Sequence, residues 1–89
     1  MKDGLYAIKD IKAGFFGVPF LGANDEIAAR IAGMIADGNQ LYSKHPEDFD
    51  LYRVGDFDNR NGAVSGGDLR FVCHLTNLVV VEEQIKETV

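Results

Sequence analysis

Hydrophobic and polar positions in the N-terminal part of the chain follow the pattern of two adjacent strands. Residues 5–8 are apolar on both faces of an extended chain, which predicts a strand over residues 4–10 with neighbours on both sides. Residues 10–14 then indicate a turn, and residues 15–20 a second, less regular strand. Because Pro19 has no backbone N–H to donate, we expect this second strand at an edge of the sheet.

The clearest periodicity lies between Asn24 and Gly38 and predicts a helix over residues 25–37. Asn24 is a favourable N-cap, and Asp25 and Glu26 place negative charge at the positive end of the helix dipole. We expect Gly38 to end the helix in a left-handed conformation. Four apolar residues recur with helical spacing and predict the packing face: Ile27, Ile31, Met34 and Ile35.

The rest of the chain alternates between turns and strands. Residues 45–48, with a proline in second place, predict a single helical turn, and residues 51–57 predict a strand. The polar cluster at residues 58–62 indicates a turn that reverses the chain into residues 63–65, and the glycines of residues 66–68 break the pattern again. Four alternate apolar positions then predict one face of a half-buried strand: Leu69, Phe71, Cys73 and Leu75.

Together these elements predict a small α+β fold, with an antiparallel or mixed sheet of about four or five strands packed by one main helix at about residues 25–37. The 89 residues fit a single domain spanning 1–89. The tail from residue 77 on fits a strand end followed by a short charged helix. The single cysteine, Cys73, cannot form an internal disulfide, so we expect self-association, most simply a dimer, to support the modest core.

Composition limits the functions open to the chain. Nine basic residues against fourteen acidic ones give a net charge of −5, which opposes non-specific attraction to phosphate and to anionic lipid. A nucleic-acid role therefore needs basic groups gathered on one face. No apolar run approaches about 18 residues, and the N-terminus lacks the apolar segment of a signal peptide. We expect a cytoplasmic protein that does not engage membranes.

Candidate catalytic and metal sites are weak. Residues 56–62 resemble a calcium-binding loop, but one ligand position carries an arginine and no glutamate closes the loop. Cys73 and His74 are adjacent on a strand and point to opposite faces, which favours a buried thiol over a zinc site. An enzyme would need a pocket that joins His45, His74 and carboxylates. We therefore expect no enzyme activity, no metal and no cofactor.

The most informative chemistry lies in residues 9–20, where lysines and phenylalanines are interleaved. On an extended chain, one apolar face is expected to join the core: Phe16, Val18 and Phe20. This leaves Phe15 for solvent or a partner. An exposed ring beside Lys9 and Lys12 can stack an unpaired base while the cations hold the backbone, as in proteins that bind single strands. The alternative is that all three phenylalanines belong to the core.

Two stretches resemble the small nonstructural protein of gokushovirus-type microviruses, which are phages with single-stranded DNA genomes. Residues 5–15 begin Leu-Tyr-Ala-Ile-Lys, and residues 45–58, closed by Gly62, contain the distinctive run His-Pro-Glu-Asp-Phe-Asp-Leu-Tyr. The resemblance spans about residues 4–64. It implies a phage protein that is not a capsid shell component, is labelled nonstructural or DNA-binding, and acts in single-stranded genome synthesis or packaging. It implies no catalytic residues.

The leading hypothesis is a non-enzymatic phage accessory protein that binds single-stranded DNA in genome synthesis or packaging. We expect six residues to contact the DNA: Lys9, Lys12, Phe15, Arg53, Arg60 and Arg70. The alternative is an acidic, homodimeric protein-interaction module that engages a phage replication or assembly protein, and it explains the net charge better. Either function places the protein in the cytoplasm of the infected bacterial host.

Overall fold

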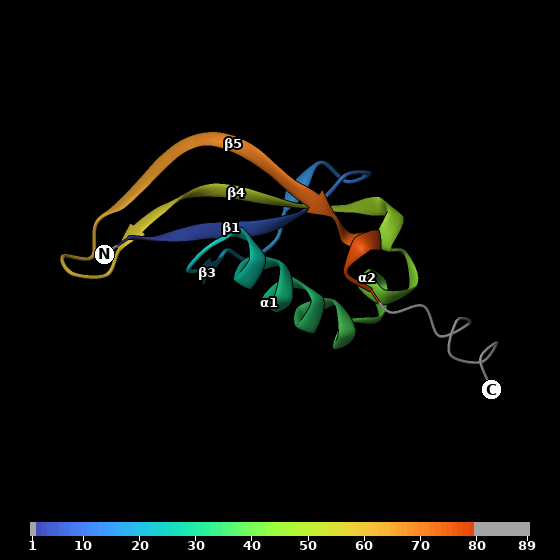
Figure 1. Cartoon of the computed structure of the whole chain (residues 1–89). Helices are drawn as coiled ribbons and strands as arrows, with labels where there is room; N and C mark the ends of the chain where they lie inside the picture. The colour runs from blue at the N-terminus through green and yellow to red at the C-terminus, as the bar shows by residue number, and fades with distance from the viewer. Residues whose placement is uncertain (1, 80–89) are drawn as a thin grey trace.

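The chain forms one antiparallel sheet with helices packed against one of its faces (Figure 1). The computed structural model describes residues 2–79, apart from the side chain of Asp68. The strands are β1 (Lys2–Asp10), β2 (Phe15–Phe16), β3 (Phe20–Gly22), β4 (Phe49–Asp58) and β5 (Val64–His74). The helices are α1 (Asp25–Asp37) and α2 (Gln40–Lys44), with 3-10 turns at Pro46–Asp48 and Leu75–Asn77. The predicted α+β class is confirmed, with a five-stranded sheet and one main helix.

The strand order is β2-β1-β4-β5, and β3 pairs with β1 on the same edge as β2. The edge position expected for residues 15–20 is confirmed, but residues 17–19 divide this segment into two short strands. The break restarts the alternation of side chains. As a result, Phe20 packs against the core as expected, whereas Phe16 and Val18 are 39% and 88% exposed, which corrects their assignment to the core.

Helix α1 has the bounds predicted from the sequence. Its start is capped as expected, because the Asn24 side chain accepts a hydrogen bond from the backbone N–H of Ile27 at 2.9 Å. The predicted packing face is wrong, since Ile27 and Met34 are exposed. The fully buried positions are three alanines spaced four residues apart: Ala28, Ala32 and Ala36.

Small residues set the distance between α1 and the sheet. A Cβ atom on Gly22 of β3 would lie 2.9 Å from Ala28 Cβ, closer than real side chains approach. The helix therefore turns its smallest side chains toward the sheet, and the larger isoleucines flank this line of contact. Gly38 ends the helix at φ −88°, so the left-handed conformation expected there is also wrong. Its backbone N–H still caps the helix by donating to the Met34 carbonyl.

Residues of β1, β4 and the last 3-10 turn complete the core beneath α1. They are Tyr6, Ile8, Phe49, Leu51 and Leu75. Helix α2, which has no signature in the apolar pattern, begins where the Asn39 side chain accepts hydrogen bonds from two backbone N–H groups. It contributes Tyr42, whose ring meets Phe49 edge to face with 4.6 Å between centroids. The single turn predicted at residues 45–48 is confirmed, with Pro46 in its first position.

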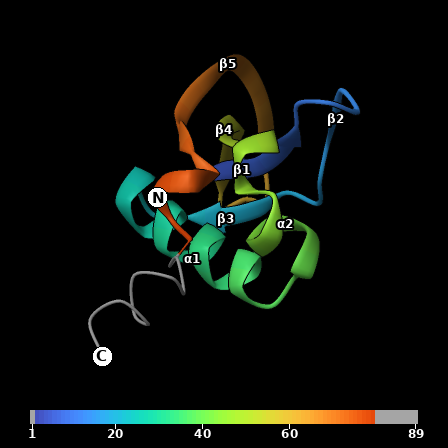
Figure 2. The ribbon, with the colours of Figure 1, turned by 90° about the vertical axis from the view of Figure 1, so that its right-hand side faces the viewer.

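Strand β5 runs without a break through residues 66–68, so the interruption expected there is wrong. Figures 1 and 2 show the strand bowing away from β4 between its two ends. The register explains the bow. Gly66 pairs with Gly55 and Arg70 with Arg53, so β5 has more residues than β4 between these two pairs and must arch to fit them.

A second irregularity, near the end of β5, reverses which side chains face the core. Cys73 lies opposite Leu51, but Phe71 lies opposite the next residue of β4, Tyr52. Val72 is therefore the extra residue of a β-bulge. The single apolar face predicted for this segment is wrong, because Cys73 packs against the core with Leu51 while Phe71 points the other way and is 44% exposed.

Two expectations concern the membrane and the C-terminus. None of the helices in the described part of the chain is long and apolar enough to cross a membrane. At the C-terminus, a 3-10 turn occupies Leu75–Asn77, and the strand end expected from residue 77 on lies mostly outside the described residues. The short charged helix expected after it lies outside the described residues.

Candidate functional site

One face of the sheet is turned away from α1, and we term it the open face. Ile8 of β1 and Leu51 of β4 point into the core beneath α1, so their neighbours along each strand point to the opposite side. Lys9 follows Ile8 and pairs with Phe16 of β2, and Tyr52 follows Leu51. These three side chains therefore lie together on the open face.

Four rings form a continuous line across the open face. They are Phe16, Tyr52, Phe71 and His74, here termed the aromatic row. Successive ring centroids are 5.7, 5.8 and 4.9 Å apart, and the interplanar angles are 75°, 80° and 60°, the edge-to-face geometry that aromatic pairs favour. Phe16 and Phe71 are both exposed, and Tyr52 is half-buried between them. The row thus presents ring surface to solvent from three strands of one sheet.

Lys9 brings positive charge to this row. Its Nζ lies 5.6 Å from the Phe16 ring centroid and 5.9 Å from that of Tyr52, which is within cation–π range. Among residues 2–79, no carboxylate lies within ion-pair distance of Lys9. The ammonium group is therefore held by the rings and keeps its charge available to a ligand.

Asp50 and His74 form a polar pair at the β5 end of the row. Asp50 is only 9% exposed, and a buried carboxylate needs a hydrogen-bond donor. His74 Nδ1 donates to Asp50 Oδ1 at 2.7 Å. This bond ties β4 to β5 and turns one acceptor oxygen of Asp50 toward His74. The negative charge nearest the row is thus partly satisfied within the protein.

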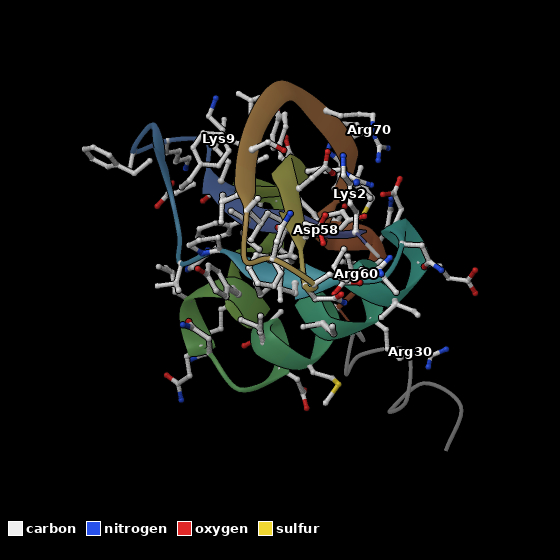
Figure 3. The ribbon with its side chains drawn as sticks, turned by 90° about the vertical axis from the view of Figure 1, so that its left-hand side faces the viewer. Lys2, Lys9, Arg30, Asp58, Arg60 and Arg70 are labelled. Atoms are coloured by element: carbon white, nitrogen blue, oxygen red, sulfur yellow. The ribbon has the colours of Figure 1, made fainter. Side chains whose placement is uncertain are left out.

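Arg70, one of the predicted DNA contacts, lies on the side of the sheet that faces α1. Its two terminal nitrogens donate to the Asp25 carboxylate at 2.6 and 2.9 Å, and the Tyr6 hydroxyl donates to the same carboxylate at 2.7 Å. The hydrogen bonds from Arg70, and then that from Tyr6, lower the pKa of Asp25 to about 2. Figure 3 shows Arg70 and Lys9 on opposite sides of the bowed β5.

The other predicted contacts are spread along the molecule. Arg53 forms an ion pair with Asp56. The Lys12 ammonium group lies 3.5 Å from the carboxylate of Asp48, in the 3-10 turn that precedes β4. Arg60 lies in the turn between β4 and β5, at the opposite end of the sheet from the aromatic row. Phe15 is 73% exposed, as predicted, and precedes Phe16 of the row on β2. The five predicted cations therefore do not gather in one groove.

None of the four residues of the aromatic row belongs to the predicted contact set. The alternation of residues 15–20 assigned Phe16 to the core, and the bulge at Val72 reverses the face on which Phe71 lies. Tyr52 can be assigned to the aromatic row only when its neighbours on the adjacent strands are known. The one local signal was the interleaving of Lys9 with nearby phenylalanines, one of which, Phe16, lies under the Lys9 ammonium group.

Three possible metal ligands occur together in the described residues. His45, Glu47 and Asp48 each offer one ligand atom, and these atoms lie within 4.8 Å of one another. The group lies on the surface, and Asp48 already pairs with Lys12. Calcium needs six or more oxygen ligands, which this turn does not assemble. The geometry therefore gives no basis for assigning a metal.

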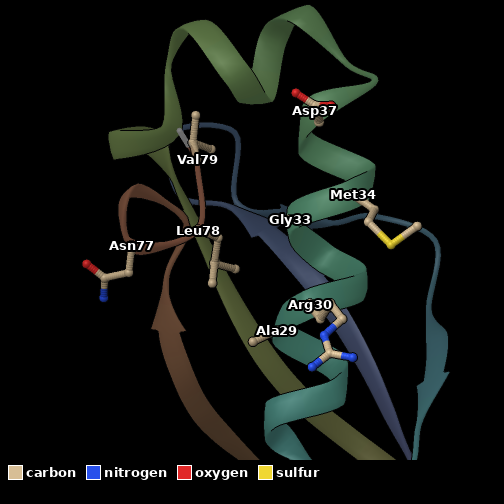
Figure 4. A pocket seen from close by; sticks show the side chains of 8 residues that line it. All are labelled: Ala29, Arg30, Gly33, Met34, Asp37, Asn77, Leu78 and Val79. Carbon is tan, nitrogen blue, oxygen red and sulfur yellow. The ribbon is translucent and has the colours of Figure 1, made fainter. Parts of the chain in front are cut away.

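A groove of about 450 Å³ lies on the helix layer, between α1 and the segment that follows β5 (Figure 4). Its lining residues are Ala29, Arg30, Gly33, Met34, Asp37, Asn77, Leu78 and Val79. Most of this surface is apolar, and its two charged side chains have opposite signs. The groove therefore suits an apolar protein segment better than a nucleic acid.

Comparison with known proteins gives one family match. A family model described as Phage ORF5 protein matches residues 3–78. No curated protein and no solved structure matches the chain. The matched residues include the aromatic row, Lys9 and all of α1.

Proposed function

The chain belongs to the Phage ORF5 protein family, and we propose that it is a non-enzymatic phage accessory protein that binds single-stranded DNA in genome synthesis or packaging. We place the phage among the gokushovirus-type microviruses, whose nonstructural protein the sequence resembles, and the site of action in the cytoplasm of the infected bacterial cell. A single-stranded genome offers unpaired bases, which are the ligand that exposed aromatic rings recognise.

The observation that carries this proposal is the position of Lys9 over the exposed rings of the aromatic row. Proteins that bind single strands without strong sequence preference combine stacking rings with cations that follow the backbone. Phe16 and Tyr52 supply rings within 6 Å of the Lys9 ammonium group. Both chemical requirements therefore meet at one corner of the open face.

The net charge of −5 sets the expected character of the binding. Arg53 and Arg70 are neutralised by Asp56 and Asp25, so few cations remain for phosphate. Each phosphate contact on a single strand contributes a slope of about −0.7 to the dependence of log affinity on log salt concentration. We therefore expect modest affinity with a shallow salt dependence, in which stacking supplies much of the binding energy.

Fluorescence anisotropy with a labelled oligonucleotide at low and moderate salt tests the proposal. The wild-type protein should bind a mixed-sequence single strand more tightly than the matching duplex, because paired bases cannot stack on a flat row of rings. Absence of binding at low salt, where electrostatics favour it most, would refute the nucleic-acid function. Tighter binding of an RNA of the same sequence would overturn the assignment to DNA.

A second function, in a different class, is favoured by the exposed edge of β5. This strand pairs with β4 on one side and exposes Val64, Leu69 and Phe71. An edge strand can add a strand from a second copy or from another protein. The corresponding hypothesis is an acidic, homodimeric module that engages a phage replication or assembly protein.

Light scattering at micromolar concentration tests this second function. The wild type should have a mass above the 9.8 kDa of one chain, and Leu69→Lys should shift it toward the monomer by placing charge on the β5 edge. Lys44→Arg, at an exposed position of α2, is the control and should leave the mass unchanged. A mass of one chain at every accessible concentration would rule out the homodimer.

A further inference from the structure

We propose that Phe16 and Phe71 are the two rings that stack DNA bases, that Tyr52 orients both of them, and that Lys9 binds the phosphate between them. The single strand then crosses the sheet from β2 to β5, instead of following the β1–β2 hairpin at Phe15. This inference rests on the proposed function, because it names the residues through which the same protein contacts DNA.

The orientation and exposure of the rings indicate different roles for the outer rings and the central ring of the row. Phe16 meets Tyr52 at 75° and Tyr52 meets Phe71 at 80°, so neither pair is stacked face to face. Phe16 and Phe71 are 39% and 44% exposed, whereas Tyr52 is half-buried. The outer two rings therefore carry the accessible surface, and the central ring restricts their rotation. Rings held in one orientation lose little conformational entropy when a base binds.

The β-bulge at Val72 places Phe71 on the open face. In a regular strand Phe71 and Cys73, two residues apart, would share a face, and Phe71 would point into the core. The bulge instead sets Phe71 beside Tyr52, with the His74 ring packed 4.9 Å away on its other side. A large apolar ring is thus held at the surface although a core position lies next to it.

Lys9 and Lys12 differ in what is near their charge. Lys12 pairs with Asp48 at 3.5 Å, whereas the Lys9 ammonium group lies over Phe16 and Tyr52 and has no carboxylate at ion-pair distance in the described part of the chain. Lys9 pairs in register with Asp50, whose carboxylate is bonded to His74, so a phosphate can bind Lys9 without displacing a carboxylate from it. The phosphate contact therefore falls over Phe16 and the central ring, Tyr52, on the side of the row from which the strand continues toward Phe71.

The chain offers matched controls for each residue of the proposed site. Phe15→Ala controls for Phe16→Ala on the same strand, Leu69→Ala controls for Phe71→Ala on β5, and Lys12→Glu matches the charge change of Lys9→Glu. Binding to a labelled single strand is measured by anisotropy at low salt. Loss of one stacked base costs about 5- to 150-fold in affinity. We expect losses in this range for Phe16→Ala and Phe71→Ala, and changes within about twofold for Phe15→Ala and Leu69→Ala.

Lys9→Glu should weaken binding and flatten its salt dependence, and Lys12→Glu should change both much less. Urea denaturation of every variant shows whether the fold is intact. If Phe71→Ala is unstable, Phe71→Leu keeps the apolar bulk without the flat ring and should show the same loss of affinity. If the folded Phe71 variant binds like the wild type, or if Phe15→Ala and Lys12→Glu carry the losses, the site is not on the open face, although the protein binds DNA. Failure of the wild type to bind would instead refute the proposed function itself.

Discussion

Arg70 and Asp25, 45 residues apart in the sequence, form a bidentate ion pair that joins β5 to the first turn of α1. The Tyr6 hydroxyl donates to the same carboxylate, so three elements meet at one side chain. Asp25 also lies where the helix dipole favours negative charge. A single carboxylate therefore fixes the start of the helix against both the middle and the edge of the sheet.

Asp25 should make the stability of the fold sensitive to acid. Its pKa is lowered from 3.8 to about 2, so the ionised carboxylate stabilises the folded state. This contribution is fully present above about pH 4 and is lost as the pH falls through the folded value. We expect Asp25→Asn to unfold at a lower urea concentration than the wild type at neutral pH, with the difference shrinking near pH 2. Circular dichroism measures both midpoints, and an equal difference at both pH values would contradict this account.

Tyr6 should give the opposite pH dependence, at the alkaline end. Burial, followed by the hydrogen bond to Asp25, raises the pKa of Tyr6, so its neutral hydroxyl form stabilises the fold. That contribution is present below about pH 10 and is lost as the pH rises through the raised pKa. Tyr6→Phe should cost about 0.5–3 kcal/mol at neutral pH, because Asp25 loses a donor. It should also reduce the alkaline loss of stability, which urea titrations at increasing pH would reveal or exclude.

The alanine face of α1 can be tested by overfilling it. Ala32 is fully buried against the sheet, so Ala32→Leu should force the helix outward and cost about 1–3 kcal/mol. Met34→Ala is the control, because Met34 is 69% exposed and its truncation should cost about 0.5 kcal/mol or less. Chemical denaturation of the two variants gives these values. Similar costs for both would mean that the alanines do not form the packing face.

The Cys73 thiol should react slowly in the folded protein. Burial is the main cause that raises its pKa, and Asp50 and then Asp25 add to the effect, so little thiolate is present at neutral pH. Alkylation by iodoacetamide should therefore be several-fold slower in buffer than in denaturing urea. Mass spectrometry of timed samples measures the two rates. Equal rates, after correction for the effect of urea on the reagent, would show that the core does not protect this residue.

Local signals in the sequence predicted the elements of the fold well. Asn24 marked the start of α1, and Gly14 and Gly62, at φ 81° and 78°, lie in the two turns that polar clusters indicated. The packing face of α1 was predicted wrongly because the prediction ranked isoleucine above alanine by hydrophobicity. Close packing against Gly22 instead favours the smallest side chains on this face.

The candidate site was less predictable, for a reason that lies in the register of the sheet. The exposure of Phe15 follows from local alternation and is found as expected, whereas Lys9 lies over Phe16, which the same alternation assigned to the core. The position of Phe71 depends on how β5 pairs with β4, and a bulge has no distinct residue pattern. Two of the arginines expected to contact DNA form ion pairs within the protein: Arg53 with Asp56, three residues further along β4, and Arg70 with Asp25 at the start of α1. The second pair could not be predicted from the sequence, because its members are 45 residues apart.

The alternation of inward and outward side chains gives β5 something like a reading frame, which the bulge at Val72 shifts by one residue. Deleting Val72 would leave Phe71 and Cys73 adjacent and on the faces that they occupy now. A one-residue insertion or deletion at a regularly paired position would instead exchange the inward and outward sets on one side of the change, exposing Cys73 or burying Phe71. A substitution in β5 alters one side chain, whereas such a change in length alters the core and the open face at once. In the evolution of this family, the length of the regularly paired parts of β5 should therefore be held more tightly than the identity of the residues within them.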